Sequence, residues 1–191
     1  THGGPIQVTK AVTIQGGSKP IVDGAGGQAT FDILHDDVTI KNFKITNSNP
    51  TSSSWNAGII ARDYDNILIR GCVIYNINHP TGLDFGISFW GTDNSEAIWN
   101  NIYNIGDYGV AFGNDNDDVL VHKCTIKNCG DIGVYARNYP LTDVEVHNCS
   151  IFGHGNYGMV NDNTGYELPA CCNWWGADNG PYHPTKNIGG L

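Results

Sequence analysis

Residues 117–136 read Asp-Asp-Val-Leu-Val-His-Lys-Cys-Thr-Ile-Lys-Asn-Cys-Gly-Asp-Ile-Gly-Val-Tyr-Ala, and this stretch decides the fold. A turn rich in aspartate precedes a long alternating apolar strand, a second turn follows, and a short strand that begins with glycine closes the unit. The chain repeats the unit, and the equivalent glycines lie 23 to 28 residues apart, at Gly58, Gly86, Gly109, Gly133 and Gly158. A period of about 20–30 residues, built from strands and turns without a helical pattern, is typical of a solenoid.

Equivalent residues of successive coils should stack about 4.8 Å apart and form rows along the solenoid axis. Apolar residues two apart mark the inward side of each strand. We expect Asn100 to be buried and hydrogen-bonded in one inward row, since an unpaired buried amide costs about 1–3 kcal/mol. The expected inward rows are Ile59/Ile87/Val110/Val134/Met159, Ala61/Phe89/Phe112/Ala136, Phe85/Tyr108/Ile132/Tyr157 and Phe43/Cys72/Asn100/Cys124/Cys149.

The six cysteines do not have the paired spacing of a zinc site. Three of them, Cys72, Cys124 and Cys149, fall in an inward row, where a thiol packs as a small apolar group. A Cys124–Cys149 disulfide is also sterically conceivable, because neighbouring coils bring Cα atoms within disulfide range.

The end of the repeat region carries a further signal, the sequence Asn-Trp-Trp-Gly-Ala-Asp-Asn-Gly-Pro-Tyr-His-Pro at residues 173–184. Together with the repeat, this ending resembles the parallel β-helix proteins of the pectate-lyase-like superfamily, including NosD-type proteins with an Asn-Trp-Trp-Gly…Gly-Pro closing coil. The resemblance implies an all-β fold, a single-stranded right-handed parallel β-helix of about six to seven coils. It also implies a secreted or cell-surface protein. It leaves the activity open, because this repeat serves lyases, hydrolases, epimerases, adhesins and scaffolds alike.

We expect one β-helix domain over residues 1–191, with an N-terminal coil or cap at 1–30, regular coils at 31–164 and a closing coil and tail at 165–191. The formal net charge of −9 and the few, scattered basic residues argue against a nucleic-acid partner. No apolar run is long enough to span a membrane. The abrupt start is that of a mature or excised chain, which is compatible with a part of a larger multidomain protein.

Two outward rows could hold a metal ion, although the sequence requires no cofactor. The first places His122 and His147 on adjacent coils, where two imidazoles could share a transition metal; two solvated histidines explain the same pattern. The second is the Asp/Asn corner before each long strand, where stacked carboxylates could hold Ca²⁺. Asp and Asn also suit such corners as plain turn residues, because they tolerate the left-handed conformation.

The variable turn and the glycine-led strand after it share one side of the solenoid, and two long insertions should wall this side. Aromatic faces stack on sugar rings, and arginine pairs with uronate or sulfate groups, so the side suits a polysaccharide or cell-wall glycan. The candidate carbohydrate-binding residues are Trp55, Arg62, Asp84, Trp90, Tyr135 and Arg137.

Catalysis on the same side is an alternative. Asp107 and Asp131, one coil apart, could couple their titrations as an acid/base pair. A histidine in the turn could act as a base near pH 7. The candidate catalytic residues are Asp107, Asp131, Arg137, His79 and His154.

Three functions therefore stay open. The first is a secreted or cell-surface module that recognises polysaccharide on the side formed by the variable turn and the glycine-led strands. The second is a small polysaccharide lyase, glycoside hydrolase or epimerase acting on an acidic glycan. The third is a structural stalk or scaffold domain.

Overall fold

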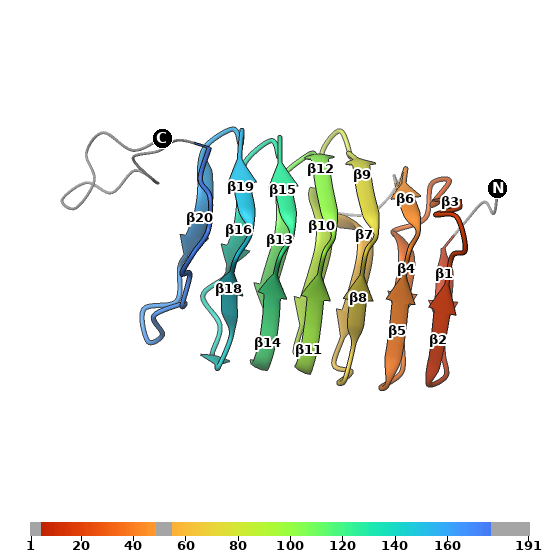
Figure 1. Cartoon of the computed structure of the whole chain (residues 1–191), viewed down its shortest axis with the longest axis horizontal. Helices are drawn as coiled ribbons and strands as arrows, with labels where there is room; N and C mark the ends of the chain where they lie inside the picture. The colour runs from red at the N-terminus through yellow and green to blue at the C-terminus, as the bar shows by residue number, and fades with distance from the viewer. Residues whose placement is uncertain (1–4, 49–54, 177–191) are drawn as a thin grey trace.

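The structure, a computed structural model, describes residues 5–48 and 55–176 of the chain, and its secondary structure there consists of strands. Figure 1 shows the strands as a row of stacked coils that runs from the N-terminal to the C-terminal end. Each coil contributes strands to three sheets, and all strand pairs are parallel. The expected parallel β-helix is therefore confirmed, with six coils and a strand, β20, that opens a seventh.

The first sheet contains the glycine-led strands β1 (Ile6–Val8), β4 (Ala29–Ile33), β7 (Trp55–Arg62), β10 (Leu83–Trp90), β13 (Tyr108–Gly113), β16 (Ile132–Ala136) and β20 (Tyr157–Asn161). The second sheet contains β2 (Val12–Gln15), β5 (Val38–Lys41), β8 (Leu68–Arg70), β11 (Asp93–Ile98), β14 (Asn116–His122), β17 (Leu141–Thr142) and β18 (Glu145–His147). The third contains β3 (Ile21–Asp23), β6 (Lys44–Thr46), β9 (Val73–Ile77), β12 (Asn101–Ile105), β15 (Thr125–Lys127) and β19 (Ser150–Phe152).

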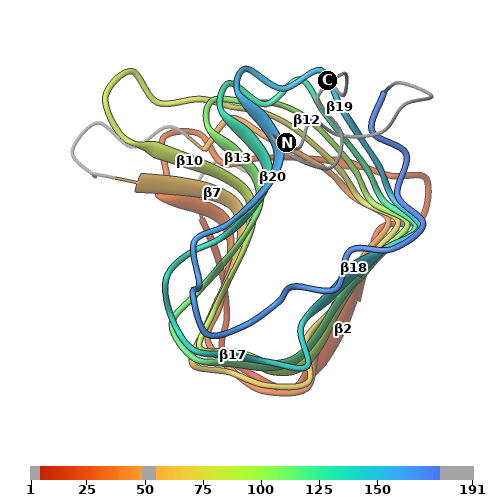
Figure 2. The ribbon, with the colours of Figure 1, turned by 90° about the vertical axis from the view of Figure 1, so that its left-hand side faces the viewer.

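The view along the axis in Figure 2 shows the coils closing around one interior, which the inward rows fill. The rows through Ile87 and Phe89 are buried in one continuous core, as the sequence predicts. Trp175 packs against the last coil of this core, while Trp174 stays exposed. Residues 177–184 of the closing sequence lie outside the described residues, as do residues 1–4 of the N-terminal cap.

Each long apolar strand expected from the sequence is in fact two strands separated by a bend. The second-sheet strand ends at the bend, one residue there adopts a positive φ, and the third-sheet strand follows. The bend breaks the alternation, so the residue directly after it points inward. The residues with positive φ at this bend are Lys19, Asn42, Gly71, Trp99, Lys123, Asn148 and Cys172.

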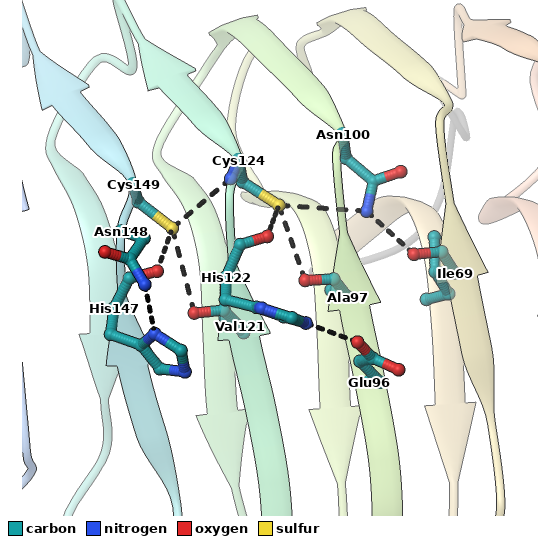
Figure 3. A network of polar contacts seen from close by, with 10 residues as sticks. All are labelled: Ile69, Glu96, Ala97, Asn100, Val121, His122, Cys124, His147, Asn148 and Cys149. Carbon is teal, nitrogen blue, oxygen red and sulfur yellow. Dashed lines mark hydrogen bonds and ion pairs between the residues drawn. The ribbon is translucent and has the colours of Figure 1, made fainter.

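The inward residue after the bend is a cysteine in three coils and Asn100 in a fourth (Figure 3). The Asn100 Oδ1 accepts the Cys72 N–H at 2.9 Å, and its Nδ2 donates to the Ile69 carbonyl at 2.9 Å. The side chain is 2% exposed, so the prediction of a buried, hydrogen-bonded amide is confirmed. All six cysteines are free thiols, and Cys149 Sγ accepts the Cys124 N–H at 3.4 Å.

One predicted inward row is wrong, namely the row of residues before each glycine. Phe85 packs outside the first sheet, in a separate apolar cluster with Ile60 and Ala111, and Tyr108 packs against that cluster. The reason is that Gly86 itself faces the interior. A Cβ there would lie 2.6 Å from Ile102 Cγ2 and 2.5 Å from the Gly109 carbonyl oxygen. Two consecutive inward residues, Gly86 and Ile87, therefore shift the preceding aromatic side chain to the outer face.

The Asn100 network generates a stability prediction. Asn100→Ala removes the partners of two buried backbone groups, so we expect a loss of about 2–4 kcal/mol in the free energy of unfolding by urea. Asn100→Cys is the matched control, because cysteine occupies this position in neighbouring coils, and we expect it to lose less than half as much. Equal losses for both variants would contradict the role given to the amide.

Candidate functional site

A groove lies on the outer face of the first sheet, beside the turn that precedes β10, whereas residues 49–54 of the other long insertion lie outside the described residues. The turn before β10 projects well beyond the turns of later coils in Figure 2. The groove has a volume of about 400 Å³. Its lining residues are Trp55, Ile60, Arg62, Leu83, Phe85, Ser88, Trp90 and Arg137.

The floor of the groove is apolar and continues as an aromatic row along the solenoid axis. Ile60 and Phe85 belong to the outer cluster and are almost fully buried. The ring centroids of Phe85 and Tyr108 are 5.5 Å apart, and those of Tyr108 and Tyr135 are 4.8 Å apart. Such a row offers ring faces and edges along more than one coil.

Two arginines rim the groove, and each lies against a tryptophan. The Arg62 Cζ is 5.1 Å from the Trp55 ring centroid, and the Arg137 Cζ is 5.4 Å from that of Trp90. Arg62 also forms an ion pair with Asp32 at 3.1 Å. Arg137 forms no ion pair with a carboxylate of the described residues. Its guanidinium is therefore held in place by an aromatic ring while its charge stays available.

The sequence placed Tyr135 and Asp84 in the same binding surface, but neither lines the groove. The Tyr135 hydroxyl donates to Asp162 Oδ2 at 2.7 Å. Burial and the Asp162 carboxylate raise the pKa of Tyr135 to about 12. The Asp84 side chain is 1% exposed, and both of its oxygens accept the His79 N–H at 3.0 Å.

The three turn aspartates form a chain of contacts from coil to coil. The Asp84 N–H donates to Asp107 Oδ2 at 2.8 Å, and the Asn156 amide donates to Asp131 Oδ1 at 2.7 Å. Burial first, and then the neighbouring Asp131 charge, raise the pKa of Asp107. Asp107 and Asp131 are thus close enough to influence each other, but they do not line the groove.

The two candidate base histidines bind turn backbone, His79 in its own turn and His154 in the turn of the preceding coil. His79 is buried, and its Nδ1 accepts the N–H groups of Thr81 at 3.1 Å and Gly82 at 2.7 Å. His154 lies against Gly133, and its Nδ1 accepts the Cys129 N–H at 3.3 Å. Burial lowers the pKa of His154 to about 4. Neither histidine lines the groove.

The stacked histidines of the second sheet lie on adjacent coils, as the sequence predicts (Figure 3). The ring centroids of His122 and His147 are 5.2 Å apart. The His122 Nε2 contacts Glu96 Oε1, and the Asn148 amide lies 2.8 Å from His147 Nδ1. Among residues 5–48 and 55–176, no group of three or more His, Cys, Asp or Glu side chains is placed to hold a metal ion.

The Asp/Asn corners before the second-sheet strands are turns in which one residue adopts the left-handed conformation. The residues with a positive φ there are Asp37, Asn66, Asn94, Asp118 and Asp143. Carboxylates of these corners also bind the backbone of the next coil. The Asp36 Oδ1 accepts the Asp65 N–H, and the Asp65 Oδ1 accepts the Asp93 N–H, each at 2.9 Å. These bonds explain the corner aspartates without a metal, and Ca²⁺ binding stays a prediction.

Four of the six candidate binding residues therefore meet in the groove, namely Trp55, Arg62, Trp90 and Arg137. Two residues of this surface were not predicted from the sequence. Leu83 lines the groove, and the ring of Tyr139 packs edge-on against Trp90, with the ring centroids 5.4 Å apart. An aromatic residue at the tip of the Asn138-Tyr139-Pro140 turn was the available signal, since turn tips favour small or polar residues.

Comparison with protein families fits this architecture. The family model described as "Right handed beta helix region" matches residues 10–171. The chain belongs to the right-handed β-helix family. No curated protein matches this β-helix at a significant level. No helix among the described residues is long and apolar enough to cross a membrane.

Two solved structures are similar to this β-helix in fold. The Dettilon tailspike protein is 14% identical, with a TM-score of 0.38, and the match covers 92% of this chain and 52% of that chain. The pectin methylesterase from Aspergillus niger is 14% identical, with a TM-score of 0.32, and the match covers 87% of this chain and 64% of that chain. The β-helix thus spans about half to two thirds of the length of these proteins.

The buried carboxyl of Asp84 generates a prediction on pH dependence. Burial raises its pKa from 3.8 to about 6, so the folded protein holds this proton more tightly than the unfolded chain. Stability should therefore fall as the pH rises through the interval from about 4 to 6. Asp84→Asn removes this cost, and its stability relative to the wild type should rise by about 2–3 kcal/mol over that interval.

The measurement is urea unfolding of both proteins at pH 4, 5, 6 and 7. Asp37→Asn is the matched control for the loss of one carboxylate, because Asn66 and Asn94 occupy the same corner in later coils. A difference between wild type and Asp84→Asn that is the same at pH 4 and pH 7 would contradict the assignment.

Proposed function

We propose that this β-helix binds a polysaccharide in the groove on the outer face of its first sheet. The observation that carries the proposal is the convergence of two tryptophan–arginine pairs, Trp55 with Arg62 and Trp90 with Arg137, over an apolar floor. Sugar rings have apolar faces that stack on indole and polar edges that accept hydrogen bonds from guanidinium groups. The groove combines both kinds of contact in one place.

The size and direction of the groove support a polymeric ligand. Its volume of about 400 Å³ lies within the range of roughly 300–1,000 Å³ found for small-molecule sites. The groove reaches from Trp55 on β7 to Arg137, which follows β16, so its lining comes from three of four successive coils. A ligand that fills it therefore runs along the solenoid axis, as a glycan chain can.

The lining of the groove favours binding over catalysis. It contains no Asp, Glu or His side chain among the described residues, whereas glycan hydrolysis commonly requires two carboxyl groups beside the scissile bond. Asp84, Asp107 and Asp131 instead bind backbone N–H or amide groups of the turns. A non-catalytic module that recognises polysaccharide is the function that this arrangement supports best. That the module meets its polysaccharide outside the cell is part of the proposal, in line with the secreted proteins that the closing sequence resembles.

Groove variants test the proposal. A glycan array with neutral and acidic polysaccharides identifies a ligand, and calorimetry then measures its affinity. Trp90→Ala and Arg137→Ala should each weaken binding about tenfold or more, since buried aromatic and arginine anchors typically contribute over 1 kcal/mol. Trp174→Ala, an exposed tryptophan outside the groove, is the matched control and should leave the affinity within about twofold.

Two outcomes would count against this function. An affinity that neither groove variant changes would place binding elsewhere. Turnover of a glycan by the wild type that Asp107→Asn abolishes in a folded protein would instead identify the chain as an enzyme.

A further inference from the structure

The third sheet, the bend before it and the last row of the second sheet together carry most of the basic residues of the chain. Although the chain has a formal net charge of −9, six of its ten Lys and Arg residues lie on this side. We call this surface the cationic face. Its basic residues are Lys19, Lys41, Lys44, Arg70, Lys123 and Lys127.

Strand register explains how residues far apart in sequence meet on the cationic face. Lys41 pairs with Arg70 in the last row of the second sheet. Lys19 and Lys123 occupy the positive-φ position of the bend in their coils. Lys127 continues the outward row of Tyr75 and Tyr103 in the third sheet. In the sequence these cations look scattered, because the coil period separates them.

Acidic side chains are nearly absent from the same rows. Of the Asp and Glu residues within 5–48 and 55–176, only Asp23 stands on an outward row of the third sheet or at the bend. Its Oδ1 already accepts hydrogen bonds from the Ala25 N–H at 2.8 Å and the Asn47 amide at 2.9 Å. The described residues contain two ion pairs, Arg62 with Asp32 and His122 with Glu96, and neither includes a cation of this face.

Aromatic rings hold several of these cations in place. The Trp99 side chain is 48% exposed, with the Arg70 Cζ 4.3 Å and the Lys123 Nζ 5.5 Å from its ring centroid. The Lys127 Nζ lies 5.6 Å from the Tyr103 ring centroid. Cation–π contacts restrict long flexible side chains, so less entropy is lost when they bind an anion.

We propose that the cationic face binds an anionic polysaccharide that lies along the solenoid axis. Coils repeat about every 4.8 Å, which is close to the length of one sugar unit in an extended chain. A glycan with regularly spaced carboxylate or sulfate groups can therefore meet Lys41 and Arg70 on adjacent coils, pass the exposed Trp99 on the next coil and meet Lys123 on the coil after that. This surface is separate from the groove, so the inference does not depend on the function proposed for the groove.

The charge of the whole chain favours a polysaccharide over a nucleic acid. A net charge of −9 repels polyanions at long range, and the repulsion grows with the charge density of the ligand. Nucleic acids carry a phosphate on every nucleotide and usually bind domains with a strongly basic balance. Tyr75 and Tyr103 also stack on each other, with ring planes at 14°, which leaves no room for a base between them.

Charge reversal on the intact chain tests the proposal, with dextran sulfate and polygalacturonate as anionic probes and dextran as the neutral probe. We expect binding of at least one anionic probe, an affinity that falls steeply with salt, and no comparable binding of dextran. Arg70→Glu and Lys123→Glu should each weaken anionic binding about tenfold.

Lys10→Glu is the matched control: it changes the net charge equally at an exposed position away from the cationic face, and should weaken binding less than about threefold. Equal losses for all three variants would overturn the proposal, because only overall charge would matter. Tighter binding of a single-stranded oligonucleotide would overturn the choice of partner. In a Trp90→Ala background, Arg70→Glu should still weaken anionic binding about tenfold, which separates binding on the cationic face from binding in the groove.

Discussion

The hydrogen bonds between successive coils are the interaction on which the rest of this structure depends. They persist even at the bend between the second and third sheets. There the Val73 N–H donates to the Phe43 carbonyl at 2.8 Å, and the Thr125 N–H donates to the Asn100 carbonyl at 2.9 Å. Because this ladder keeps equivalent residues of all coils in register, any residue type repeated at one position becomes a row along the axis. Inward rows then form the core, and outward rows form the surfaces available for binding.

The same ladder explains what could be predicted from the sequence. A row needs only the coil period and the alternation of apolar residues, and both are visible in residues 117–136. The burial of Asn100 followed from its place in a row of cysteines, and the contact of His122 with His147 followed from their equivalent positions. The cationic face was not predicted, because the coil period separates its basic residues in the sequence and only the register of the coils brings them together.

What could not be predicted depends on local breaks in the alternation. The inward placement of Gly86 turns Phe85 outward, and the bend at Trp99 turns one strand into two. Neither break interrupts the periodic pattern of apolar residues, so the sequence carries no signal for it. The groove owes its floor to the first of these breaks, since the outer cluster of Phe85 and Ile60 exists only because of it. The roles of the turn aspartates could not be predicted either, because their hydrogen bonds to backbone N–H groups depend on the detailed path of each turn.

Two faces of one solenoid thus present different chemistry, an apolar groove rimmed by arginines and a cationic face with an exposed tryptophan. Variation between coils is concentrated on these faces, whereas the inward rows keep their character from coil to coil. A polysaccharide that follows the axis could use the regular coil spacing on either face.

The five tryptophans allow the most direct measurement, because they report on different parts of the surface. In a ¹⁵N-labelled protein, each indole N–H gives one signal, and single Trp→Phe variants assign them. Titration with a bound neutral glycan should shift the signals of Trp55 and Trp90 and leave those of Trp99, Trp174 and Trp175 in place. A glycan that binds while the Trp55 and Trp90 signals stay unchanged would contradict the assignment of the groove as the binding site.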